Sequence, residues 1–336
     1  MRDGETMMRC WKKILPCLFV ILMVVGVFSS CSSVGRIKST AEEAKVVGTC
    51  AGYEVRYEEL RYLVMKHKEE LISQYGDGIF DTEEGGEQYE EELKKLVNAS
   101  LCQSYAILDL CEKEKIRTAD KVTKKEVQEE VDAAASVLGG TKEYKAYLDE
   151  NYMTDAVYRL YAAIVSCQSR YYDVLAQNMQ KEAYDAVFAQ DGFVRTMSIF
   201  VRNDPGESKS ENRAAAEYVR DRIREGKSIE SFIGTKYNQD TSNCDYYFPR
   251  GYMDEAYENA AFALEIGEVS DVVEVTDGFY VMVRLAPEDG YFQNNLETLM
   301  QKYIVGKMNI AFADRAGELT FEPNEYGKTL VFHSMK

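Results

Sequence analysis

The fold of the second half of the chain is decided by three blocks within residues 246–280: Tyr-Tyr-Phe-Pro-Arg-Gly-Tyr-Met at 246–253, Glu-Asn-Ala-Ala-Phe-Ala-Leu-Glu-Ile-Gly-Glu-Val-Ser at 258–270, and Thr-Asp-Gly-Phe-Tyr at 276–280. Upstream of them, the β-branched content of 194–201 predicts a strand. The unit that contains these blocks, 193–288, is predicted to hold strands at 194–201 and 279–285 and helices at 210–225, 229–236 and 255–264.

The blocks resemble the C-terminal half of a parvulin, the small α+β prolyl isomerase domain. The likeness is strongest in Arg-Gly-Tyr-Met at 250–253, Ala-Ala-Phe-Ala-Leu at 260–264 and Gly-Glu-Val-Ser at 267–270, and the spacing between these blocks matches as well. The predicted order of strand, helices and strands is also the parvulin order. The resemblance covers nearly all of 193–288 and implies a parvulin-like fold, with a small antiparallel sheet and surrounding helices.

The resemblance also implies which residues form the site. Three positions that grip the proline ring of the substrate fall on Phe248, Met253 and Tyr257. Asp240 stands where active parvulins have Cys or Asp. The two remaining positions belong to a pair of histidines in parvulins, and this chain has Ser198 and Tyr280 there. We therefore expect substrate-binding roles for Phe248, Met253 and Tyr257 and catalytic roles for Asp240, Ser198 and Tyr280.

Both parvulin histidines are thus absent, and Asn-Cys-Asp-Tyr-Tyr at 243–247 replaces the glycine-rich segment of the family. Ser198 and Tyr280 each offer a hydroxyl that can donate and accept a hydrogen bond, so they can form a network beneath Asp240. Rotation about an X-Pro bond is limited by amide resonance, with a barrier of about 18–20 kcal/mol. A site that binds the twisted amide best lowers that barrier without a nucleophile or cofactor.

The N-terminus has the features of a secretory signal. Arg2, Arg9, Lys12 and Lys13 precede an apolar run at 14–28, and small residues follow it. The run has about 15 residues, fewer than the roughly 20 that a membrane-spanning helix needs. Phe-Ser-Ser-Cys at 28–31 resembles a bacterial lipobox, which implies cleavage after residue 30 and lipidation of Cys31. The alternative is a soluble secreted protein in which Cys31 has no such role.

The remaining N-terminal half is predicted to be helical. Residues 31–45 have no apolar periodicity and are expected to form a flexible tether. A short strand and turn at 46–55 lead directly into a helix at Tyr57, which resembles the opening of the PrsA/SurA-type chaperone domain. Apolar residues at three- and four-residue spacing predict further helices at 87–115, 123–137, 142–150 and 154–189.

The C-terminal segment, 289–336, is predicted to contain a helix at 292–316 and a strand at 319–321. In PrsA/SurA-like proteins such a segment returns to complete the chaperone domain. The resemblance therefore implies an α+β protein in which 46–192 and 289–336 form a helical domain and 193–288 is inserted. The helices are rich in tyrosine, which either lines a cradle for unfolded chains or packs in the ordinary way. The residues concerned are Tyr57, Tyr62, Tyr144, Tyr147, Tyr152, Tyr158, Tyr161, Tyr171 and Tyr172.

Composition limits the kind of partner. The formal net charge of −17 argues against nucleic acid and against a basic membrane-binding patch. His67 and His333 are the only histidines, so neither a zinc site nor a His-dependent triad is expected, and no metal or cofactor is predicted. Five cysteines beyond Cys31 show no regular spacing and are expected to be buried small hydrophobic residues.

These features together predict an extracytoplasmic folding factor, anchored to the bacterial cell membrane as a lipoprotein, that isomerises X-Pro bonds in secreted clients and binds them as a chaperone. Its expected partners are unfolded or newly translocated polypeptides. The sequence does not decide whether two copies form a homodimer. The alternative is a non-catalytic holdase with a degenerate parvulin domain. A solute-binding lipoprotein would require two α/β lobes, against which the long helices argue.

Overall fold

The computed structural model describes residues 33–81, 83–203, 208–238 and 244–336. The predicted signal peptide at 1–30, Cys31 and Asp240 lie outside these ranges. The described chain divides into two compact units. The sheet unit is Leu175–Ile310, and the helical unit joins 33–174 to Ala311–Lys336. Within the described ranges, no helix combines the length and apolar character needed to span a bilayer.

The helical unit is built mainly from long amphipathic helices. Its elements are β1 (Val46–Cys50), β2 (Tyr53–Arg56), α2 (Tyr57–Tyr75), η1 (Asp77–Phe80), α3 (Glu83–Lys113), α4 (Lys121–Leu138), α5 (Thr141–Glu150), most of α6 (Asp155–Asn178), the end of α11 (Leu296–Gly317), β7 (Glu322–Pro323), η3 (Gly327–Thr329) and η4 (Phe332–Ser334). Apolar residues such as Leu60, Leu93, Leu101 and Ile164 are fully buried between the helices. The three- and four-residue spacing of such residues explains why these segments fold as helices.

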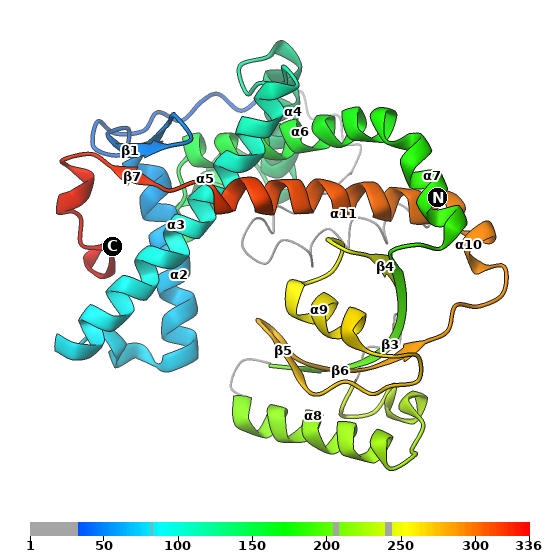
Figure 1. Cartoon of the computed structure of the whole chain (residues 1–336). Coiled ribbons are helices and arrows are strands. Elements are labelled where there is room, and N and C mark those ends of the chain that lie inside the picture. The colour runs from blue at the N-terminus through cyan, green and yellow to red at the C-terminus, as the bar shows by residue number, and fades with distance from the viewer. Residues whose placement is uncertain (1–32, 82, 204–207, 239–243) are drawn as a thin grey trace. The chain divides into compact units, whose positions relative to one another are not determined.

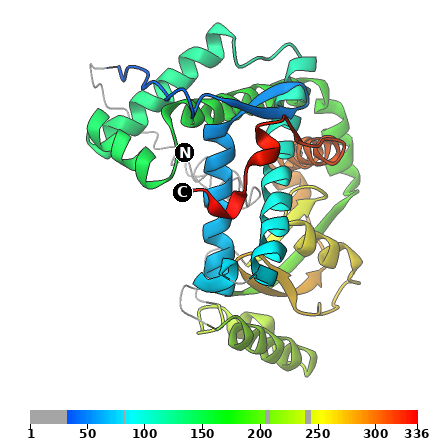
Figure 2. The ribbon, with the colours of Figure 1, turned by 90° about the vertical axis from the view of Figure 1, so that its left-hand side faces the viewer.

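The C-terminal segment of the helical unit packs on its N-terminal elements. β7 pairs antiparallel with β1, and β1 also pairs with β2. Arg315 Nε donates to Asp109 Oδ2 of α3 at 2.7 Å. Figure 2 shows the last residues (red) beside α2 and α3, where Glu90 accepts hydrogen bonds from the backbone N–H groups of Phe332 and His333. The first and last described elements of the helical unit thus pack together.

The sheet unit contains a four-stranded antiparallel sheet with strand order β4-β3-β6-β5. Its elements are α7 (Gln180–Ala189), β3 (Phe193–Arg202), α8 (Lys209–Arg224), η2 (Ile229–Phe232), β4 (Asp245–Pro249), α9 (Glu255–Ala263), β5 (Val273–Val275), β6 (Gly278–Leu285), α10 (Tyr291–Asn294) and the greater part of α11. The predicted α+β class is confirmed.

Alternation along the strands gives this sheet two different faces. One face carries Ile199, Val201, Phe279 and Val281, which form a buried cluster with α8 and η2. The opposite face is covered by α9, and Figure 1 shows α8 and α9 on the two sides of the sheet. The apolar face against α8 stabilises the unit, which leaves the α9 side to carry polar residues.

Several elements differ from their predictions in extent. The helix predicted at 154–189 is divided at Met179 into α6 and α7. The final strand lies at Glu322–Pro323, just after the predicted 319–321. Strands β4 and β5 were not predicted.

The nine tyrosines considered for a cradle differ in burial, and most of the described cysteines are buried. Tyr144, Tyr158, Tyr161 and Tyr171 are buried, and the other five tyrosines considered for a cradle are half-buried. Ordinary helix packing therefore accounts for the buried four. Cys50, Cys102, Cys111 and Cys167 are buried free thiols, as expected, whereas Cys244 is half-buried.

Candidate active site

The sheet face beneath α9 brings together two of the predicted catalytic residues. Thr196, Ser198 and Phe200 alternate along β3 and so point to the same side. In the register with β6, Ser198 lies opposite Met282 and Phe200 lies opposite Tyr280. Ser198 and Tyr280 are therefore diagonal neighbours on one face of adjacent strands. The two histidine positions of the parvulin pattern thus meet in space.

Tyr257 links α9 to this face through its hydroxyl. The hydroxyl lies 2.7 Å from Thr196 Oγ1, and a further hydrogen bond joins it to Ser198. Tyr257 is 1 % exposed. Burial raises its pKa to about 12, although the hydrogen bonds with Ser198 and Thr196 act in the opposite direction. The phenol therefore stays neutral and acts as a hydrogen-bonding centre beneath α9.

Phe248 lies deeper than a ligand-contacting side chain usually does. It is 0 % exposed and packs against Tyr257 and Phe262, at ring-centroid distances of 5.7 and 6.1 Å. Its position on β4, opposite Val194 of β3, places it in the core under α9. Phe248 and Tyr257 thus form the floor of the site, below the surface that a substrate can reach.

Met253 is half-buried on the turn that leads into α9. The turn is held by the buried carboxylate of Glu258, which accepts hydrogen bonds from the N–H groups of Gly251, Tyr252 and Met253 at 2.8, 3.1 and 3.3 Å. Asp254 caps α9 by accepting from the N–H groups of residues 256 and 257. The backbone of the turn at Met253 is therefore held by residues of α9 and its cap.

Gly251 allows this turn to pack closely against α11. Its φ is +78°, and a Cβ at this position would lie 2.3 Å from the carbonyl oxygen of Gly306. A Cβ at Gly306 would in turn lie 2.3 Å from the carbonyl oxygen of Arg250. Only glycine satisfies both requirements at Gly251, the left-handed backbone and the missing side chain. The close packing against α11 therefore explains why the Arg-Gly-Tyr-Met block has glycine at position 251.

Tyr280 is the predicted catalytic residue that remains half-exposed. Its ring stacks on Phe200 with centroids 4.4 Å apart and meets Tyr257 edge to face at 4.8 Å. Burial raises its pKa, and the neighbouring Tyr257, Asp254 and Asp277 raise it further. Tyr280 therefore presents a neutral hydroxyl, suited to hydrogen bonding and unsuited to proton transfer near neutral pH.

Asp240 lies outside the described residues. The described residues that flank it on either side contact the sheet. Asn238 Oδ1 accepts from Phe200 N at 3.5 Å, and Asn238 Nδ2 donates to Cys244 Sγ at 3.2 Å. The backbone N–H of Ser198 donates to the carbonyl of Cys244 at 2.8 Å.

Phe200 is the site residue that sequence reasoning missed. Its signal was the alternation Thr196, Ser198, Phe200, which places an aromatic ring two positions from a predicted catalytic residue. The site as a whole combines neutral hydroxyls with a half-buried thioether and aromatic rings. Such a set can bind an apolar ring and hydrogen-bond an amide, and it offers no charged nucleophile among the described residues.

Residues 199–285 match the family model described as "Rotamase: PPIC-type PPIASE domain". The sheet unit carries a parvulin-type domain. Over a longer stretch of 277 residues, the chain is 26% identical to the foldase protein PrsA of Caldanaerobacter subterraneus. This stretch is 79% of this chain and 80% of the relative. The chain is 27% identical over 103 residues to the foldase protein PrsA of Bacillus subtilis, 29% of this chain and 35% of that one.

A solved structure of foldase protein PrsA from Streptococcus pneumoniae covers 81% of this chain and 91% of its own, at 15% sequence identity and a TM-score of 0.36. The predicted likeness to PrsA-type proteins with a parvulin-type domain is confirmed by the sequence matches. The matched residues include the end of β3 and all of α9 and β6, and therefore Tyr257 and Tyr280, whereas Ser198 lies one residue before the match.

Proposed function

We propose that this protein is an extracytoplasmic folding factor that isomerises X-Pro bonds in secreted proteins and binds the same clients as a chaperone. The observation that carries this proposal is the rotamase match at 199–285, which contains β4, α9, β5, β6 and the end of β3. The domain boundaries at 193 and 288 belong to the same proposal. The charge of −17 fits protein clients and does not fit nucleic acid.

The proposed site works by binding the twisted amide more tightly than either planar form. Met253 contacts the proline ring from the turn before α9, and Phe248 and Tyr257 support that contact from below. Tyr280 and Ser198 supply neutral hydroxyl groups, and Asp240 completes the set. A dry, apolar site favours the twisted amide because rotation removes the charge separation of the planar form.

We further propose that residues 1–30 are a signal peptide and that Cys31 is diacylated. A single acyl chain binds a membrane only marginally, whereas two chains anchor a protein stably. The clients would then be newly translocated polypeptides near the membrane surface. Substituting Cys31→Ser in the bacterial host tests the anchor, because the wild-type protein should sediment with membranes and the variant should be released.

The isomerase function is tested by the refolding of a protein whose slow phase is limited by X-Pro isomerisation. Uncatalysed isomerisation takes tens to hundreds of seconds, so a catalyst shortens that phase. Catalytic amounts of the soluble chain from Ser32 onward should accelerate it. If the slow phase is unchanged while client aggregation is suppressed, the protein is a holdase and the isomerase proposal is wrong.

A further inference from the structure

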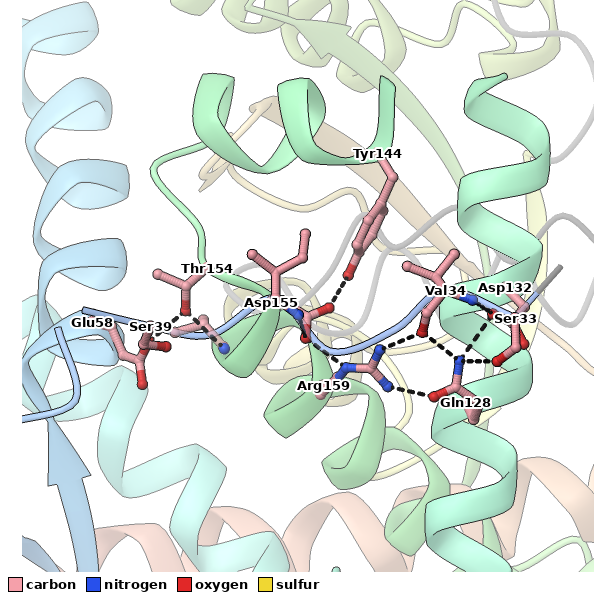
Figure 3. Close-up of polar contacts among 12 residues, drawn as sticks. Ser33, Val34, Ser39, Glu58, Gln128, Asp132, Tyr144, Thr154, Asp155 and Arg159 are labelled. Atoms are coloured by element: carbon pink, nitrogen blue, oxygen red, sulfur yellow. Dashed lines mark hydrogen bonds and ion pairs between the residues drawn. The ribbon is translucent and has the colours of Figure 1, made fainter. Parts of the chain in front are cut away.

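We propose that the helical unit carries a binding surface for extended polypeptide and that the chain's own residues 33–39 occupy it. The surface consists of Gln128 and Asp132 of α4 and Asp155 and Arg159 of α6, which we call the backbone-binding surface. Figure 3 shows the segment lying across these side chains. The inference deepens the chaperone part of the proposed function and rests on it.

The contacts at Val34 engage both polar groups of its backbone. Asp132 Oδ1 accepts from Val34 N at 2.6 Å. The carbonyl oxygen of Val34 accepts from Gln128 Nε2 at 3.0 Å and from Arg159 Nη2 at 3.3 Å. The Val34 side chain is 4 % exposed. One residue of the segment is therefore held by three side chains, none of which reads its identity.

A second contact follows three residues later. Ile37 N donates to Asp155 Oδ2 at 3.3 Å. Ser39 Oγ then donates to Glu58 Oε2 at 2.5 Å, and the same oxygen accepts from Thr154 Oγ1 at 2.7 Å. Backbone groups are common to every polypeptide, so the backbone contacts at Val34 and Ile37 tolerate many sequences, whereas the contact at Ser39 depends on its side chain. Clients of a folding factor share an exposed backbone and little else.

The surface is organised by contacts that do not involve the segment. Asp155 accepts from Arg159 Nε at 2.7 Å and from the hydroxyl of Tyr144 at 3.1 Å. Arg159 Nη1 donates to Gln128 Oε1 at 2.9 Å. These contacts orient the remaining donors and acceptors before a ligand arrives, which lowers the entropic cost of binding.

Another extended chain could take the place of the segment 33–39. Among the described residues, no hydrogen bond between main-chain groups fixes 33–39, and these residues form no helix or strand. Gly35, Arg36 and Lys38 are exposed. Side chains alone secure the segment, so another extended chain that offers an N–H donor and a carbonyl can replace it. Carboxylates of the surface favour ligands that are basic, as this segment is.

This finding differs from the expectation that 31–45 is a free tether. The physical reason is that polar side chains on α4 and α6 provide partners for the backbone of 33–39, which low apolar content alone did not indicate. A tether that occupies a client site in cis also competes with clients at high effective concentration. The free surface should therefore bind peptides more tightly than the occupied one.

The test releases the segment without truncating the protein. In the soluble chain from Ser32 onward, Val34→Pro with Ile37→Pro removes the two N–H donors. Gly35→Pro with Lys38→Pro is the matched control, because neither N–H donates a hydrogen bond to a described residue. The only tryptophan of the sequence is Trp11, which lies before Ser32 and is therefore missing from the soluble protein. The fluorescence of a tryptophan-labelled peptide then reports binding directly. The peptides are residues 32–41 and a shuffled version of them.

The released variant should bind both peptides with a Kd at least tenfold lower than that of the wild type or the control. Adding Asp132→Ala, at a half-buried position, should abolish this gain in affinity. N-methylation of the peptide amides that correspond to Val34 and Ile37 should abolish it as well. Equal affinities of all forms would overturn the inference. Client aggregation, measured on the same samples, separates the proposed chaperone function from the backbone-binding surface. If aggregation is suppressed but the released variant gains no affinity for the peptides, the proposed function stands and only the inference about this surface is wrong.

Discussion

The phenol rings of Tyr257 and Tyr280 meet edge to face, with centroids 4.8 Å apart and planes at 78°. Tyr257 is buried and bonded to Thr196, whereas Tyr280 is half-buried. Two adjacent tyrosines of the candidate site thus differ in access to solvent. The difference assigns a structural role to the first hydroxyl and leaves the second available to a substrate.

Phenylalanine substitutions separate these two roles. Tyr257→Phe should lower the free energy of unfolding by about 1–3 kcal/mol, because Thr196 and Ser198 lose a buried hydrogen-bond partner. Tyr280→Phe should change that free energy little and should reduce the isomerase rate. Urea denaturation and an isomerase assay on both variants provide the comparison. Equal losses of stability would contradict the assignment.

Met253 and Phe248 should respond differently to truncation. Met253→Ala should lower kcat/KM about tenfold, equivalent to about 1.4 kcal/mol of transition-state binding, with a small effect on folding. Phe248→Ala should cost about 3–5 kcal/mol of stability, as is usual for a buried phenylalanine. Ile266→Ala, at a side chain that is 63 % exposed, is the control and should leave both quantities unchanged.

Glu258 should act as a positioning residue for Met253. Glu258→Ala leaves three N–H groups of the turn without their acceptor, and each such group costs about 1–3 kcal/mol when it is buried. We expect a lower melting temperature together with a higher KM for X-Pro peptides. Glu255→Ala, at an exposed position in the same helix, is the matched control. An unchanged KM in the Glu258 variant would show that the turn does not position Met253.

Glu59 of the helical unit should make stability depend on pH. It is 2 % exposed, and its Oε1 has no hydrogen-bond partner among the described residues. Burial raises its pKa to about 7, and the hydrogen bond from Tyr105 opposes the shift. The folded state therefore binds a proton more tightly than the unfolded state, and stability falls as pH rises from about 4.5 to 7.

The Glu59→Gln variant removes this loss. It should be more stable than the wild type at pH 8, by an amount on the order of 3 kcal/mol, and nearly equal to it at pH 4. Chemical denaturation at several pH values gives the free energy of unfolding of both proteins. The contributions of the other titrating groups cancel in the difference between the two values. Glu54→Gln, at an exposed residue, is the matched control. A constant difference across pH would mean that Glu59 does not titrate in this range.

The sequence predicted what depends on local pattern. The β-branched content of 194–201 located β3, and three- and four-residue spacing located most of the long helices. Helices were also predicted at 210–225 and 255–264, where α8 and α9 lie. Ser198 and Tyr280 were identified by resemblance, and their register across β3 and β6 places them on one face. Phe200 was overlooked although it alternates with Ser198 along β3.

Contacts between distant side chains and backbone were not predictable in this way. Glu258 closes the turn at 251–253 through its carboxylate, and nothing in its helical position indicates that role. Asp132 accepts from Val34 across 98 positions of sequence. Such partners carry no periodic signal, because each depends on how separately formed elements pack.

The central claim is tested most directly by NMR exchange spectroscopy of X-Pro peptides with the soluble chain from Ser32 onward. We expect cis–trans exchange faster than the uncatalysed rate, with most of the acceleration lost in Met253→Ala and retained in Ile266→Ala. Peptide resonances that shift on binding while the exchange rate stays at its uncatalysed value would contradict isomerase activity and leave a chaperone with a parvulin fold.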